Sequence, residues 1–123
     1  MKRTNYMILA IILSVIPLVI FAVTYNEIDY EIVYINTGMM NCQENDNCYE
    51  PSLVTVEKGD KVIWINQDMH MHTVTSSNAT DNFELSSDTL RKGESYSHTF
   101  EKSGSYPYYC VLHDWMIGSV IVT

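Results

Sequence analysis

A short stretch near the end of the chain brings together three side chains that bind soft metal ions. In YYCVLHDWMIG, Cys110, His113 and Met116 follow one another at intervals of three residues. A further histidine, His72, lies upstream in the segment WINQDMHMHTV. Thiolate, thioether and imidazole groups are ligands for copper and zinc in proteins. These residues are therefore the candidate metal ligands of the chain.

The chemistry of this set favours one copper ion. A thiolate and two imidazoles in a trigonal plane, with a distant thioether, form the coordination set of a blue-copper electron-transfer site. Such a set lies between the preferences of Cu(I) and Cu(II), so little has to move when an electron arrives or leaves. The residues predict that Cys110 is the strong ligand and Met116 the weak axial one. His72 and His113 would complete the plane.

Zinc is the alternative metal. Cys42, Cys48, Cys110 and His113 could together form a Cys3His zinc site. Cys42 and Cys48, however, flank the polar segment QENDN, and a nearby pair of this kind in an exported protein most often forms a disulfide. A zinc site would also leave Met116 without a role. The sequence therefore favours a Cys42–Cys48 disulfide and copper.

Short strands must position these ligands. Segments rich in β-branched and aromatic residues alternate with glycine-containing turns, which predicts an all-β sandwich. We expect residues 57–60 to form the turn of a hairpin between strands at 53–56 and 61–66. The remaining strands are expected at residues 28–35, 72–76, 95–101, 105–110 and 119–123.

The first part of the chain predicts export. Lys2 and Arg3 precede an apolar run from Tyr6 to Val23, which is just long enough for a membrane helix of about 20 residues. The positive-inside rule then places the rest of the chain outside the cytoplasm, on the periplasmic or extracellular face. A cleaved signal peptide and a secreted domain are the alternative. We expect an anchor or signal at residues 1–25, a first strand and disulfide-bearing loop at 26–50, and the core of the domain at 51–123.

Net charge narrows the choice of partners. The chain carries a formal charge of −8, and two of its seven basic residues, Lys2 and Arg3, lie at the N-terminus. Nucleic acid is an unsuitable partner, because phosphate binding needs clustered basic residues. Acidic charge serves solubility, and it can also steer association with a basic protein. We expect a monomer.

The exported domain resembles the cupredoxins, the small blue copper proteins of the plastocyanin and amicyanin group. The resemblance covers roughly residues 51–123. It rests on the compact C-x2-H-x2-M spacing from Cys110 to Met116, which is that of amicyanin, and on the W-x-N segment beginning at Trp64, which leads to His72 as the first ligand. The resemblance implies a Greek-key β-sandwich with one type 1 copper and a role as a one-electron carrier between redox proteins.

This chain departs from the family pattern at two positions. Thr73 stands where the family often has an asparagine that braces the ligand loop. Asp114 stands where amicyanin-type loops usually have proline. Because hydrogen bonds around a copper site tune it, the reduction potential cannot be transferred from the family.

The residues around the ligands have simpler expected roles. We expect His70 to be exposed and not to bind the metal, and His98 to be a surface or partly buried histidine. Met69, Met71 and Trp115 would form an apolar rim around the metal, through which His113 passes electrons to a docked partner.

Two other functions compete with electron transfer. A multicopper oxidase or copper nitrite reductase needs further histidine-rich sites, whereas this chain has four histidines. We therefore expect that the chain is not an enzyme. A copper carrier or chaperone outside the cytoplasm is the second alternative, since such proteins use labile, methionine-rich sites.

Overall fold

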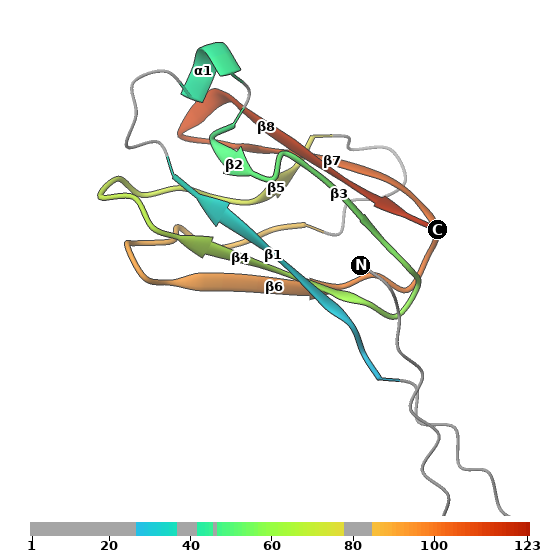
Figure 1. Ribbon diagram of the computed structural model, residues 1–123. Coiled ribbons are helices and arrows are strands. Elements are labelled where there is room, and N and C mark those ends of the chain that lie inside the picture. The colour runs from blue at the N-terminus through green and yellow to red at the C-terminus, as the bar shows by residue number, and fades with distance from the viewer. Residues whose placement is uncertain (1–26, 37–41, 46, 78–84) are drawn as a thin grey trace, which may run out of the picture.

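The computed structural model describes residues 27–36, 42–45, 47–77 and 85–123. Eight strands and one short helix make up this part of the chain (Figure 1). They are β1 (Tyr30–Ile35), α1 (Cys42–Asn45), β2 (Tyr49–Glu50), β3 (Leu53–Val56), β4 (Lys61–Asn66), β5 (Thr75–Ser76), β6 (Ser95–Thr99), β7 (Gly104–Cys110) and β8 (His113–Val122).

The strands form two four-stranded sheets that lie in two layers. One sheet has the order β2-β1-β4-β6, and the other has the order β3-β8-β7-β5. Two neighbouring pairs, β1 with β4 and β3 with β8, are parallel, and the other pairs are antiparallel. The predicted all-β sandwich is confirmed. The predicted first strand is an inner strand of its sheet, so residues before position 51 also contribute to the sandwich.

Alternating apolar residues fill the space between the sheets. In β4 every second side chain is buried, among them Val62 and Trp64. The indole of Trp64 meets the ring of Tyr108 from β7 edge-on at 5.4 Å, and Tyr49 from β2 meets the same ring at 4.9 Å. A side chain at Gly118 of β8 would overlap the Tyr108 ring, so glycine is required for this close approach. Full burial of one such aromatic side chain contributes roughly 1.5–3 kcal/mol.

The predicted hairpin between β3 and β4 is wrong. β3 pairs with β8 in one sheet, whereas β4 pairs with β1 and β6 in the other. The turn between them has the expected chemistry: Gly59 has a φ of 91°, and the Asp60 carboxylate accepts a hydrogen bond from the Glu57 N–H at 2.8 Å. Gly59 also donates to the carbonyl of Phe100 at 2.7 Å. The turn therefore connects the two layers, and the strands on either side of it contribute Val56 and Val62 to the same core.

Two predicted strand boundaries also change at the end of the sandwich that carries the candidate ligands. Only Thr75–Ser76 of the expected strand at 72–76 is a strand, and His72 instead makes an isolated bridge with Leu90. The last strand is longer than predicted, since β8 already begins at His113. The connection between the strands expected at 105–110 and 119–123 is thus only a turn of two residues, Val111 and Leu112.

The Cys42–Cys48 disulfide is present. Both cysteines are buried, and the bond closes the segment around α1 immediately before β2. Because these thiols are already bonded to each other, the alternative Cys3His zinc site is excluded.

The expected anchor or signal at residues 1–25 lies outside the described residues. Within the described segments, none of the helices has the length and apolar character needed to span a membrane.

Candidate metal centre

The hairpin of β7 and β8 positions two of the candidate ligands. Cys110 is the last residue of β7 and pairs with His113, the first residue of β8. A β-bulge at Tyr109 and Cys110 shifts the register at this point. Such bulges redirect a side chain at the end of a strand. Cys110 is fully buried, and its Sγ lies 3.7 Å from Nδ1 of the half-buried His113.

His72 approaches the same sulfur from the segment between β4 and β5. Its backbone exchanges two hydrogen bonds with Leu90, at 3.1 and 2.8 Å. The imidazole is completely buried, and its Nδ1 lies 3.8 Å from the Cys110 Sγ. The donor atoms of His72, Cys110 and His113 all lie within 4.8 Å of one another. This is the spacing of three ligands that share one ion.

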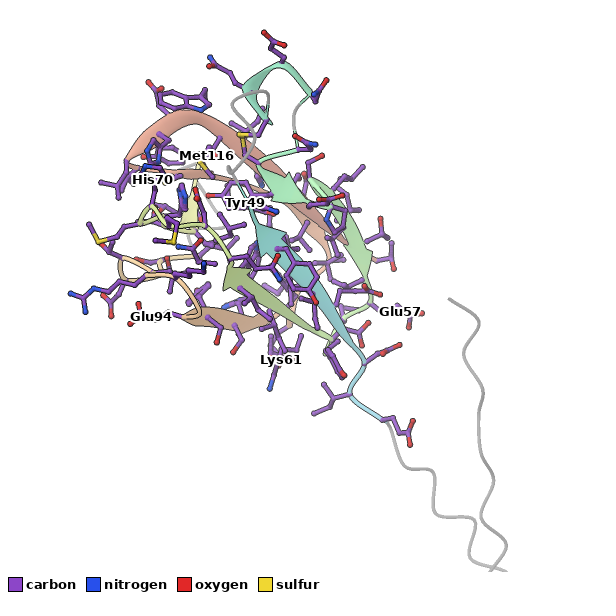
Figure 2. The ribbon with its side chains drawn as sticks, turned by 60° about the vertical axis from the view of Figure 1, so that its left-hand side comes forward. Tyr49, Glu57, Lys61, His70, Glu94 and Met116 are labelled. Carbon is purple, nitrogen blue, oxygen red and sulfur yellow. A yellow bond between two sulfur atoms is a disulfide. The ribbon has the colours of Figure 1, made fainter. Side chains whose placement is uncertain are left out.

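Met116 lies on the inward face of β8, three residues after His113. Its side chain is completely buried. Figure 2 shows Met116 at the same end of the sandwich as His70, far from Glu57 and Lys61. The structure therefore places the predicted axial residue at the end of the molecule that carries the cluster.

A carboxylate that the sequence analysis did not single out contacts His72. The Nε2 atom of His72 lies 2.9 Å from Oδ2 of Asp68, and both side chains are buried. Asp68 is held in turn by Asn66, whose Oδ1 accepts from the Asp68 N–H at 2.9 Å. The Asn66 amide donates to the carbonyls of His70 and Leu90 at 2.8 and 2.9 Å. The one feature of the sequence that could have predicted this contact is the presence of a carboxylate four residues before the first ligand.

Thr73 connects the two sides of the site. Its backbone N–H donates to the Cys110 Sγ at 3.3 Å, and its Oγ1 accepts from the Val111 N–H at 3.0 Å. The Tyr49 hydroxyl donates to the Thr73 carbonyl at 2.5 Å. Threonine therefore braces the turn between Cys110 and His113 at the position where the family often has an asparagine in this role.

Hydrogen bonds prepare these groups to bind a metal. Burial alone would raise the pKa of the Cys110 thiol, but hydrogen bonds from His72 and from the Thr73 N–H lower it to about 6. Burial disfavours a charged His72, yet its bonds to Cys110 and Asp68 raise its pKa above the ordinary value. Burial would likewise raise the pKa of Asp68, and the bond from His72 holds it below its ordinary range. The thiolate, which is the form that binds metals, is therefore easier to form at Cys110 than at an ordinary cysteine.

The residues of the predicted apolar rim are exposed. Met69, Met71 and Trp115 are 76, 49 and 46% exposed. The Trp115 ring contacts the ring of His113 at 5.3 Å. His70 is exposed, as predicted, although its Nδ1 lies 3.5 Å from the Asp68 carboxylate. His98 is partly buried against Phe100, also as predicted.

The comparison with known families agrees with this geometry. Residues 36–123 match the copper binding proteins of the plastocyanin/azurin family. The chain belongs to this family. One type 1 copper ion is therefore its cofactor, and the donor set fits that ion, because two imidazoles and a thiolate converge beside a buried methionine.

Individual relatives show how far the likeness extends. Amicyanin from Paracoccus denitrificans is 35% identical over 75 residues, which cover 60% of this chain and 57% of amicyanin. Chloroplastic plastocyanin from Tetradesmus obliquus is 32% identical over 83 residues, with the same two coverages of 60 and 57%. The chain thus spans little more than half the length of these relatives. The structure of a purple cupredoxin from Nitrosopumilus maritimus superposes with a TM-score of 0.64 at 29% identity, covering 75% of this chain and 98% of that one.

Proposed function

We propose that the protein is a blue copper protein that carries single electrons between redox partner proteins outside the cytoplasm. The observation that carries this proposal is the convergence of the donor atoms of His72, Cys110 and His113 within 4.8 Å. These atoms come from two separate parts of the chain and are brought together by the packed sandwich. Membership of the plastocyanin/azurin family supports the same conclusion.

Each ligand has a defined role in this proposal. The Cys110 thiolate and the imidazoles of His72 and His113 would hold the copper, the imidazoles through Nδ1, the nitrogen that each directs at the sulfur. The Met116 thioether would be the fourth and weakest ligand. The bound copper supplies the change between the +1 and +2 states. The surrounding protein excludes water and holds the ligands in place, because three of these side chains are completely buried.

Electrons would enter and leave through His113. It is the only one of the proposed ligands that is not fully buried, and Trp115 packs against its ring. The apolar rim of Met69, Met71 and Trp115 would form the surface on which a redox partner docks. Apolar, aromatic and methionine side chains are enriched in the centres of protein interfaces. The negative charge of the chain would accelerate association with basic partners.

The same site argues against catalysis. Four protein ligands would fill the coordination sphere of the copper, so no position would remain for a substrate. We propose a monomer that is not an enzyme. Residues 1–25 would either anchor it in the membrane, with the domain at residues 26–123 outside the cytoplasm, or be removed as a signal peptide before secretion.

An optical and electron paramagnetic resonance spectrum of the copper-loaded protein tests this function. We expect strong absorption from charge transfer between the Cys110 thiolate and Cu(II), together with reversible one-electron cycling. Cys110→Ser is the matched control, because serine retains the shape of cysteine but offers no soft thiolate; it should abolish this absorption. Absence of the absorption from the metal-replete wild type would refute the proposal.

Transport of copper itself is the second candidate function. The exposed Met69 and Met71, which shortly precede His72 in the chain, favour it, since thioethers bind Cu(I). A colourless protein that passes Cu(I) to an acceptor protein would establish this alternative.

A further inference from the structure

We propose that Asp68 is a positioning residue for the copper site, and that its carboxylate favours Cu(II) over Cu(I). This inference rests on the proposed ligation by His72. It assigns to Asp68 two separable effects: it keeps the His72 proton on Nε2, which leaves Nδ1 free for the metal, and it lowers the reduction potential.

The first effect follows from the two nitrogens of the His72 ring. Nε2 lies 2.9 Å from the Asp68 Oδ2, whereas Nδ1 faces the Cys110 sulfur at 3.8 Å. An ionised carboxylate can only accept hydrogen bonds, so Nε2 must be the donor. The tautomer with its proton on Nε2 has its free lone pair on Nδ1, where the proposed metal lies. A carboxylate partner thus fixes which nitrogen is available to the metal.

Asp68 can perform this role because its own position is fixed. Its Oδ1 accepts from the Met69 N–H at 2.6 Å, and its backbone N–H donates to the Asn66 Oδ1 at 2.9 Å. Asn66 is completely buried, and its amide binds the Leu90 carbonyl. Leu90 in turn bonds to the backbone of His72. The carboxylate and the imidazole are therefore parts of one closed hydrogen-bond network.

The second effect follows from charge. Asp68 is 6% exposed, so water screens its negative charge only weakly. One imidazole ring separates it from the proposed metal position. A negative charge stabilises a doubly charged ion more than a singly charged one at the same distance. The hydrogen bond to Asp68 also makes the imidazole more basic and therefore a stronger ligand for the metal. Both contributions favour Cu(II), and the protein should accordingly be a better electron donor.

Substitution of Asp68 by asparagine separates this role from a merely structural one. Asparagine has nearly the same shape as aspartate. If its Oδ1 still accepts the hydrogen bond from the Met69 N–H, its NH2 group faces His72 Nε2. That nitrogen would then have to accept a hydrogen bond instead of donating one. The matched control is Asp114→Asn, which removes one negative charge from the exposed neighbour of His113. We expect Asp68→Asn to shift the balance between Cu(I) and Cu(II) about tenfold toward Cu(I), which corresponds to a potential about 59 mV higher. The control should shift it much less.

Nitrogen NMR of the metal-free Cys110→Ser variant gives an independent test, because in the wild type the Cys110 thiolate is a second acceptor that competes with Asp68 for the His72 proton. In mildly alkaline solution, where the ring carries a single proton, we expect His72 in this variant to hold that proton on Nε2 and to exchange it slowly with solvent. A proton on Nδ1 would overturn the positioning role, even if Asp68→Asn failed to fold. Equal potentials for the Asp68 and Asp114 variants would overturn the electrostatic role. Neither result depends on the blue colour of the wild type, which tests the proposed function separately.

Discussion

The metal centre has two sides that are built in different ways. Cys110, His113 and Met116 belong to one hairpin, in which β7 and β8 pair across a turn of two residues. His72 instead lies in an irregular segment, where its imidazole contacts Asp68 and its backbone bonds to Leu90, whose carbonyl also accepts from the Asn66 amide. The hairpin side therefore depends on local backbone pairing, whereas the His72 side depends on a buried network. Loss of one partner from such a network leaves other buried polar groups unsatisfied.

The two histidines also differ in their access to solvent. His72 is completely buried, while His113 is half-buried beside the exposed Trp115. The buried side of the site should therefore hold the metal in place, and the exposed side should exchange electrons with partners.

Removal of each imidazole gives the largest expected difference between the two sides. We expect His113→Gly and His72→Gly each to abolish the strong thiolate-to-copper absorption. Added imidazole should restore the spectrum in His113→Gly, because solvent reaches that position, but not in His72→Gly, because that position is buried. Optical titration with imidazole measures both responses. Equal rescue of the two variants would show that burial does not distinguish them.

Disruption of the network should destabilise the whole domain. Asn66→Ala would leave two carbonyls and the Asp68 N–H without the side-chain partners that they have in the structure. We expect the metal-free protein to lose about 2 kcal/mol in its free energy of unfolding, since the buried Asp68 N–H loses its partner and an unsatisfied buried group costs about 1–3 kcal/mol. Denaturant unfolding measures this loss. The neighbouring exposed Gln67→Ala is the control and should change stability by less than about 0.5 kcal/mol. Similar values for the two variants would contradict the importance of the network.

Loss of the hydrogen bond from Val111 to Thr73, which links the two sides, should have the smallest effect on stability. Thr73→Val retains the shape of the side chain but removes the oxygen that accepts from Val111. We expect a loss of about 1 kcal/mol in the free energy of unfolding. Hydrogen exchange at the Val111 amide should also become faster. Thr73→Ser keeps the oxygen and should retain the slower exchange; if serine and valine behave alike, Thr73 does not brace the turn.

The predicted hairpin between β3 and β4 shows where local patterns are insufficient. Alternation and turn residues correctly located both strands and the turn at Gly59. They did not show that the turn crosses between sheets, because a strand has the same pattern whether its neighbour in sequence lies beside it or opposite it. The choice depends on pairing with β8 and β1, which are distant in sequence.

The amino-acid sequence by itself was enough to predict an all-β sandwich and a copper site with His72, Cys110, His113 and Met116 as its candidate ligands. For Cys110, His113 and Met116 this was possible because ligand type and short spacing are local properties, and a hairpin keeps residues that are close in sequence close in space. His72 was identified from its position after the W-x-N segment of the family pattern. The contact of Asp68 with His72 and the bracing contact of Thr73 were decided only by the tertiary structure. Both depend on hydrogen bonds whose direction is set by packing between distant segments, such as the contact of Thr73 with Cys110 across 37 positions of the chain.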